Sequence, residues 1–221
     1  VYKRQGLMIE NAKENSQRVE LKDRIIETAS EAFTAHGIKS ITMDDIAASL
    51  GISKRTLYEV FQDKESLLTQ CILKRQEEMN AFLAETLANS KNVLEVILVC
   101  YQRSIETFHR TNKRFFEDIK KYPKVHSLLK NYRERDSDST IEFFKMGIKQ
   151  GIFRDDVNFA IVNLLVHEQL YLLMNTDICN KYSFLEVYEA IMFTYIRGIS
   201  TEKGAKVLED FITEYRKQRI H

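Results

Sequence analysis

Residues that could contact a nucleic acid gather in a short stretch in the first third of the chain. If this stretch is helical, its outward face carries small, polar and cationic side chains: Ser53, Lys54, Arg55, Thr56, Tyr58 and Glu59. Such a face suits a helix that enters the major groove of a DNA duplex, where side chains of these types reach the base edges. The stretch therefore predicts a DNA-binding helix, which neighbouring elements must hold in place.

Catalytic and metal-binding patterns are missing from the sequence. It has no G-x-S-x-G, no glycine-rich phosphate loop and no H-E-x-x-H. The cysteines and histidines lie too far apart to indicate a metal site: Cys71, Cys100, Cys179, His109, His126 and His167. The acidic pairs Asp44-Asp45 and Asp155-Asp156 stand at predicted helix starts, where the helix dipole favours carboxylates. We therefore predict no enzyme activity, no cofactor and no metal.

The composition indicates a folded helical chain. Of the 221 residues, 44% are hydrophobic and 29% are charged, and the net charge of +1 excludes a basic coat over the whole surface. Seven glycines and one proline favour long helices over β-sandwiches and barrels. Polar residues interrupt the most apolar segment, Ala160 to Met174, so no membrane span is predicted. Val1 to Gly6 lacks the apolar core of a signal peptide, and we expect a cytoplasmic protein.

Apolar residues recur with a period of about 3.6 along almost the whole chain, which predicts an all-α fold. The first helix is expected around Leu21 to Phe33, short helices follow Thr42 and Ser53, and a long helix runs from Lys64 to Asn89. Further helices are predicted at residues 92–111, 113–121, 123–150, 156–176, 183–199 and 202–219. Residues 1–17 are predicted to be a disordered extension, within which Met8 is a candidate native start.

A glycine joins the two short helices predicted between Thr42 and Phe61. Ala47 is small enough to let the second helix approach closely, and Gly51 can adopt the positive φ that a tight turn needs. Leu57 and Phe61 are four residues apart, so they face back onto the first helix together. An ordinary helical hairpin also uses a tight glycine turn and stays open as an alternative. The polar outward face favours a helix-turn-helix that binds DNA.

Residues 21–68 resemble the N-terminal DNA-binding domain of the tetracycline-repressor (TetR) family. The matching features are the Gly37 break, Thr42-x3-Ile46-Ala47, Leu50-Gly51-Ile52-Ser53, Leu57-Tyr58-x2-Phe61 and Lys64-Glu65-x-Leu67. Val60 departs from the pattern, because the family often has a polar residue there. The resemblance implies a three-helix DNA-binding domain at residues 18–65 and a larger helical domain for effector binding and dimerisation at residues 66–221. It also implies a homodimeric repressor that a small, largely apolar or aromatic effector releases from a palindromic operator.

The resemblance further implies roles for individual residues. Thr42 at a helix N-terminus, the hydroxyl group of Tyr58 and the ammonium group of Lys64 are expected to contact DNA phosphates. The residues expected at or near the base edges are Ser53, Lys54, Arg55 and Thr56. Of these, Arg55 is the best candidate for two hydrogen bonds to a guanine. A half-buried core aromatic is the alternative interpretation of Tyr58.

Two C-terminal segments, residues 156–176 and 183–199, are apolar around more of their circumference than one core needs. The resemblance implies that they pair with a second copy of the chain as a four-helix bundle. The residues predicted at this interface are Leu164, Tyr188, Ile191, Met192, Tyr195 and Ile199. The alternative is that both segments are central helices of a monomer.

An effector cavity is predicted among the helices between residues 64 and 176. Its candidate lining is Met79, Phe82, Tyr101, Ile105, Phe108, Phe116, Phe143, Met146, Gln169 and Tyr171. Core packing explains any one of these residues better than ligand contact does, so the set supports only an apolar or aromatic ligand. The resemblance implies that the effector favours a conformer with wrongly spaced DNA-binding helices. A ligand that tightens DNA binding, or no ligand, stays open.

An all-helical adaptor that binds other proteins is the alternative function. It predicts that the outward face of residues 53–59 tolerates alanine without loss of function.

Overall fold

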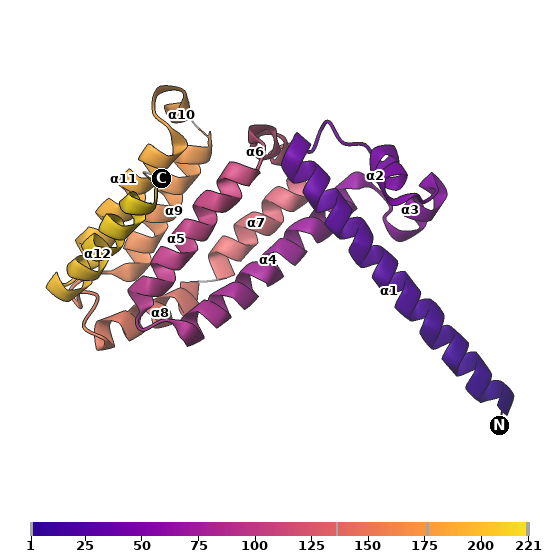
Figure 1. Ribbon diagram of the computed structural model, residues 1–221, viewed down its shortest axis with the longest axis horizontal. Coiled ribbons are helices and arrows are strands. Elements are labelled where there is room, and N and C mark those ends of the chain that lie inside the picture. The colour runs from indigo at the N-terminus through magenta and orange to yellow at the C-terminus, as the bar shows by residue number, and fades with distance from the viewer. Residues whose placement is uncertain (1, 136, 176, 220–221) are drawn as a thin grey trace. The chain divides into compact units, whose positions relative to one another are not determined.

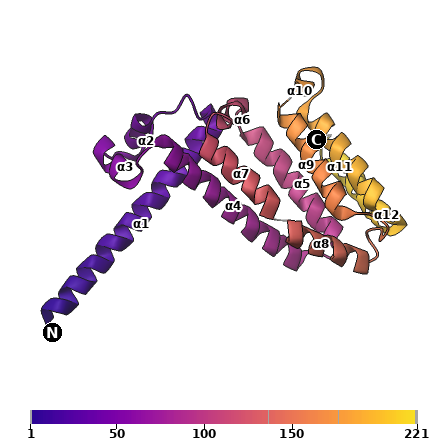
Figure 2. The ribbon, with the colours of Figure 1, turned by 180° about the vertical axis from the view of Figure 1, so that it is seen from behind.

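The computed structural model describes residues 2–135, 137–175 and 177–219. Within these ranges the fold is all-α, as predicted, with one isolated antiparallel bridge between Phe153 and Ser200. Figures 1 and 2 show the helices from opposite sides. They are α1 (Tyr2–His36), α2 (Met43–Leu50), α3 (Lys54–Val60), α4 (Lys64–Asn89), α5 (Val93–Arg110), α6 (Lys113–Ile119), α7 (Pro123–Arg135), α8 (Ser137–Lys149), α9 (Phe159–Asn175), α10 (Ile178–Lys181), α11 (Phe184–Ile199) and α12 (Glu202–Arg219).

Three segments differ from what the sequence predicts. The segment predicted as one helix, residues 123–150, holds α7 and α8, and Asp136 between them lies outside the described residues. The short helix α10 was not predicted, because four residues are too few to show a helical period. Residues 2–17, predicted to be disordered, are helix in the structure. They are rich in lysine, glutamate, arginine and glutamine, which favour helix without needing a core to pack against.

The chain divides into two compact units. Unit 1 comprises Val1–Met79 and Phe108–Leu129, and unit 2 comprises Asn80–Thr107 and Lys130–His221. Helices α4, α5 and α7 each contribute residues to both units. The domain boundary predicted after residue 65 is a different division of the chain and stays a prediction. No helix in the described ranges is long and apolar enough to cross a bilayer.

The core of unit 1 joins α1 to the two short helices that follow it. The predicted apolar stripe of α1 is buried, and Ile25, Ala29 and Phe33 are each 0% exposed. These residues form one cluster with the apolar faces of α2, α3 and α4 and with Phe115 of α6. Helices α2 and α3 therefore rest on a shared hydrophobic core, which fixes the face that each of them turns to solvent.

The core of unit 2 is built around Tyr101 of α5. Its ring stacks on Tyr188 of α11 at a centroid distance of 5.3 Å and lies 5.2 Å from the ring of Phe193. The rings of Phe211 and Tyr215 in α12 meet it edge-on. Aromatic contacts of this kind add to area burial, so α5, α11 and α12 are held together by one aromatic cluster.

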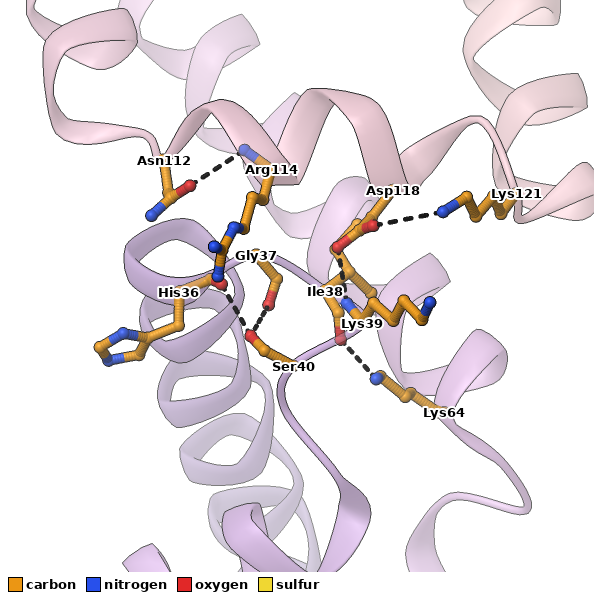
Figure 3. Close-up of polar contacts among 10 residues, drawn as sticks. All are labelled: His36, Gly37, Ile38, Lys39, Ser40, Lys64, Asn112, Arg114, Asp118 and Lys121. Atoms are coloured by element: carbon orange, nitrogen blue, oxygen red, sulfur yellow. Dashed lines mark hydrogen bonds and ion pairs between the residues drawn. The ribbon is translucent and has the colours of Figure 1, made fainter.

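Helix α6 is tied to the turn between α1 and α2 (Figure 3). The buried carboxylate of Asp118 accepts a hydrogen bond of 2.7 Å from the backbone N–H of Lys39 and lies 3.8 Å from the ammonium group of Lys121. Gly37 in this turn has a φ of +85°, and a Cβ built on it would lie 2.7 Å from Cβ of Arg114. Glycine is required here twice, for its left-handed backbone and for the close approach of α6.

Asn112 completes this attachment from the residue that precedes α6. Its backbone N–H donates to the carbonyl of Thr34 at 2.8 Å, and its side-chain amide donates to the carbonyl of Ala35 at 3.1 Å. Its side-chain oxygen accepts the N–H of Arg114 at 2.9 Å and caps α6. Carbonyls at the end of α1, which have no partner within their own helix, thus find donors at the start of α6. We call the contacts of Asp118 and Asn112 the α6 attachment.

The α6 attachment predicts the effect of Asp118→Ala on stability. The free energy of unfolding should fall by about 1–3 kcal/mol, because the partly buried N–H of Lys39 loses its acceptor. Urea denaturation followed by circular dichroism measures this change. The control is Asp155→Ala, since Asp155 is exposed and makes no hydrogen bond or ion pair with described residues; its effect should stay within about 0.5 kcal/mol. Equal stability of the two variants would contradict a structural role for Asp118.

Candidate nucleic-acid interface

Helix α2 begins at a capping box formed by Thr42 and Asp45. The hydroxyl group of Thr42 accepts the N–H of Asp45 at 3.1 Å, and the carboxylate of Asp45 accepts the N–H of Thr42 at 2.8 Å. The Thr42 hydroxyl also donates to this carboxylate, and these bonds hold the pKa of Asp45 below its usual value. The reciprocal bonds satisfy backbone donors at the helix start and so fix where α2 begins.

The turn after α2 has the left-handed geometry that the sequence predicts at Gly51. Its φ is +66° and its ψ is 27°, and the N–H of Ile52 donates to the carbonyl of Ala47 at 3.1 Å. A Cβ built on Gly51 would meet nothing within 4 Å, so the requirement for glycine here comes from the backbone and not from space. Ile52 is half-buried against the unit 1 core, as expected of a residue that pins the turn.

Helices α2 and α3 bury the apolar residues that the pattern assigns to their contact. Ile46 is 1% exposed, Ala47 3%, Leu57 0% and Phe61 4%, and all belong to the unit 1 core. Ser53 accepts the N–H of Thr56 at 3.0 Å and caps α3, as predicted. The predicted helix-turn-helix is therefore present with its predicted packing.

The outward face of α3 carries the polar side chains that the sequence analysis selected. The exposed residues are Ser53, Lys54, Arg55, Tyr58 and Glu59, and Thr56 and Val60 are half-buried. Tyr58 is 42% exposed, and the ammonium group of Lys54 lies 5.9 Å from the centroid of its ring. The alternative of Tyr58 as a core aromatic does not describe this position, because its ring stands on the same face as the cations.

The cations of this face are paired with carboxylates of the same two helices. Lys54 contacts Asp44 at 2.9 Å, and Nε of Arg55 contacts Glu59 at 3.0 Å. The hydrogen bond that the ammonium group of Lys54 donates to Asp44 raises the pKa of Lys54. Ion pairs as exposed as these contribute little to stability in water, so an incoming phosphate or base can replace the carboxylates.

Lys64 is oriented differently from the phosphate contact expected for it. Its ammonium group donates to the carbonyl of Ile38 (Figure 3). It also lies 5.7 Å from the centroid of the Phe33 ring. Burial lowers the pKa of Lys64, while the charges of Asp118 and Asp45 oppose this shift. A phosphate contact would need the side chain to leave this position. The hydroxyl group of Thr42 would likewise have to leave its partner to contact a phosphate, because it donates to Asp45 in the capping box.

The residues predicted at a dimer interface occupy different surroundings. Leu164 of α9 is 59% exposed, whereas Tyr188 and Ile199 of α11 are 8% and 2% exposed within their own chain. Ile191, Met192 and Tyr195 are half-buried against the unit 2 core. The exposed apolar residues of α9 also include Ile161, Leu165, Tyr171 and Leu172. Helix α9 therefore carries five exposed large apolar residues, more than any other helix of the described ranges, and α11 uses much of its apolar surface inside unit 2.

The residues predicted to line an effector cavity are divided between the units. Met79, Phe108 and Phe116 belong to unit 1, and the rings of Phe108 and Phe116 stack at 5.7 Å. The seven others belong to unit 2: Phe82, Tyr101, Ile105, Phe143, Met146, Gln169 and Tyr171. Of these, Tyr101 and Ile105 are buried in the core, and Phe82 lines a cavity of about 940 Å³. This unit 2 cavity is bordered by α4, α5 and α12, and α12 lies outside the helices predicted to form a cavity.

Metal and thiol chemistry have little to build on in the described parts of the chain. These parts hold no group of three or more histidine, cysteine, aspartate or glutamate residues that could bind a metal ion. Burial raises the pKa of the Cys71 thiol to about 11 and also raises the pKa of Cys100. A thiol with a raised pKa stays protonated near neutral pH and is a weak nucleophile.

Sequence relatives of the chain are regulators of transcription. Residues 25–71 match the family described as bacterial regulatory proteins, tetR family, and this range covers the end of α1, α2, α3 and the start of α4. The transcriptional repressor KstR2 of Mycobacterium tuberculosis is 23% identical over 160 residues, which are 70% of this chain and 78% of that protein. The transcriptional regulator SAB2452 of Staphylococcus aureus is 37% identical over 78 residues, which are 35% of this chain and 37% of that protein.

A similar fold is found in solved structures. A transcriptional regulator of Saccharomonospora viridis, solved in complex with choline, has a TM-score of 0.67 at 17% identity. The match covers 83% of this chain and all of that one. The matched helix-turn-helix, its exposed α3 and the relatives in sequence and fold agree with one another. Residues 25–71 therefore form a DNA-binding domain of the tetR family type, and the named relatives support a DNA-binding transcriptional regulator.

Proposed function

We propose that the chain is a homodimeric repressor that inserts α3 into the major groove of each half of a palindromic operator. One observation carries this proposal: the left-handed turn at Gly51 and the buried Leu57 leave α3 with an exposed face of polar and cationic side chains. A relative named as a transcriptional repressor supports repression over activation. The expected cytoplasmic location agrees with a protein that acts on DNA.

Arg55 is proposed to read a base. Its side chain is 89% exposed and contacts Glu59 through Nε, so the terminal nitrogens are available to a guanine. Lys54, Ser53 and Thr56 are proposed to lie at or near the base edges of the same groove. Tyr58 is proposed to donate its hydroxyl group to a phosphate, and Thr42 and Lys64 are proposed to contact the backbone after leaving their present partners.

The dimer is proposed to form through α9 and α11 of two copies. On α9 the exposed apolar residues Ile161, Leu164, Leu165 and Leu172 fall on one face at helical spacing. On α11 the exposed residues Ala190, Thr194 and Gly198 are small, and a Cβ built on Gly198 would meet nothing within 4 Å. A second helix can approach such a face closely while covering the leucines of α9. A monomer would leave this apolar surface in water.

The effector is proposed to be a small organic cation with an apolar or aromatic body, bound in the unit 2 cavity. Three aromatic residues line this cavity: Phe82, Phe211 and Tyr215. Four carboxylates line it as well, from Glu85, Glu95, Asp210 and Glu214, with Lys91 as the one basic residue of the lining. Aromatic faces and carboxylates together favour cations with apolar substituents. The choline complex of the Saccharomonospora viridis regulator supports this chemistry.

The variant Arg55→Ala tests the proposed base contact. Binding to a duplex from the region upstream of the chain's own gene should weaken by about 1–3 kcal/mol, and one base position should lose its preference. Fluorescence anisotropy titrations at several salt concentrations measure both effects. Lys206→Ala is the matched control, because Lys206 forms an exposed i,i+4 pair with Asp210 on α12. An unchanged affinity of Arg55→Ala would favour the protein-binding adaptor instead.

Another prediction concerns Leu164→Arg. The parent chain should sediment as a dimer at micromolar concentration without DNA, and the variant should sediment as a monomer, because a charge replaces a buried leucine at the interface. Val19→Arg is the control, because Val19 is an apolar residue of similar exposure, 55%, and lies on α1, which is not part of the proposed interface. A monomeric parent, or a variant that stays dimeric, would rule out this interface.

A further prediction concerns the effector. Choline and benzyltrimethylammonium should raise the dissociation constant of the operator complex, and Glu85→Gln should weaken the binding of both cations. Glu85 is exposed in the cavity lining, and its carboxylate has no partner among the described residues. Isothermal titration calorimetry measures cation binding, with Glu106→Gln, an exposed glutamate outside the lining, as the control. Cation binding that ignores the Glu85 charge would locate the effector elsewhere.

A further inference from the structure

Unit 1 contains a cavity of its own, distinct from the unit 2 cavity. Its volume is about 440 Å³, and α1, α4, the end of α5 and α6 contribute its lining. The walls are apolar where they are buried, and these residues are Phe33, Leu68, Cys71, Ile72 and Phe115. A volume of this size falls in the range of small-molecule sites, and an apolar wall is their usual lining.

Arg75 brings an available hydrogen-bond donor into this cavity. The residue is half-buried, and its guanidinium carbon lies 5.6 Å from the centroid of the Phe115 ring. Among the described residues it makes no hydrogen bond and no ion pair. Other arginines of the chain do pair: Arg154 contacts Asp156 at 2.7 Å, and Arg197 contacts Glu209 at 2.8 Å. The planar fork of Arg75 thus lies over an aromatic ring, and its donors have no partner among the described residues.

The charges around Arg75 leave this fork without a carboxylate partner. Three glutamates line the cavity, Glu27, Glu31 and Glu78, and each is exposed at its rim. Burial lowers the pKa of Arg75 and the charge of Glu78 opposes this shift, so water is partly withdrawn from the guanidinium. Two further cations belong to the same lining: Lys74 is half-buried and Arg110 is exposed. An anionic group inside the cavity would therefore lie close to these cations. The carboxylates of the three glutamates are exposed to water, which screens their charge.

We propose that the unit 1 cavity binds an organic carboxylate with a compact apolar or aromatic body. The carboxylate accepts two hydrogen bonds from the guanidinium of Arg75, and the body packs on Cys71, Ile72 and Phe115. A charge-assisted pair is strengthened where the donor is partly shielded from water. The site shares no lining residue with the unit 2 cavity, so it stands apart from the proposed cationic effector.

The position of this site connects it to the α6 attachment. Thr34 and Ala35 line the cavity, and their carbonyls accept the two hydrogen bonds from Asn112. A ligand that contacts α1, α4 and α6 together binds the folded unit and not the unfolded chain. Its binding should therefore raise the melting temperature of the protein by mass action.

Calorimetric titration of the full chain with 2-naphthoate tests the proposal. The parent should bind 2-naphthoate, and it should bind the uncharged 2-naphthamide at least about tenfold more weakly, because the amide lacks the charge that the fork recognises. This comparison needs no variant. Octanoate serves as a second carboxylate, with an aliphatic body. The proposal would be overturned if neither carboxylate bound at millimolar concentration, or if 2-naphthoate and 2-naphthamide bound with equal affinity.

Arg75→Met then locates the site. Methionine keeps an apolar stem over the Phe115 ring and removes the fork, so affinity for 2-naphthoate should fall about tenfold or more, while affinity for the amide should stay unchanged. Arg103→Met is the matched control, because the Arg103 guanidinium lies 4.0 Å from the centroid of the Phe82 ring in unit 2, outside this cavity. Circular dichroism confirms that both variants fold. Undiminished binding of 2-naphthoate by Arg75→Met would overturn the assignment of the carboxylate to this cavity. This outcome does not depend on whether the chain binds choline or an operator.

Discussion

The left-handed turn at Gly51 is the constraint on which the DNA-binding surface depends. The backbone there must take a φ of +66°, which a residue with a Cβ adopts only with strain. The turn lets the N–H of Ile52 close the end of α2 and lets Ser53 open α3 immediately afterwards. With the turn fixed and Leu57 buried, the rotation of α3 about its axis is determined. The polar side chains then face solvent together.

Features that depend on residues close in sequence could be predicted. The capping box of Thr42 and Asp45, the cap at Ser53 and the turn at Gly51 involve groups within four residues of one another. Helix rules alone determine such contacts. Burial of Leu57 was equally predictable, because its place on the apolar face follows from the helical period. The helix-turn-helix was therefore predictable to the level of single residues. The all-α class of the fold was also predictable, from the helical period of the apolar residues.

Features that depend on distant residues could not be predicted in the same way. The hydrogen bond from Lys39 to Asp118 spans 79 residues, and nothing distinguishes Asp118 from other acidic residues in the sequence. Lys64 keeps the partner that is nearest in the folded chain, the carbonyl of Ile38, which pattern alone does not indicate. Periodicity shows that α11 is apolar, yet it does not tell whether Tyr188 and Ile199 pack inside the chain or against a second copy. The lining of cavities is hidden for the same reason.

Selection of duplexes from a random pool by the purified chain tests the central claim most directly, because it requires no prior choice of operator. Two α3 helices related by a two-fold axis should enrich one palindromic sequence, with half-site centres about 34–36 Å apart or a multiple of that distance. Retention of the starting composition after repeated rounds, even in dilute salt where phosphate contacts are strongest, would contradict DNA reading by α3.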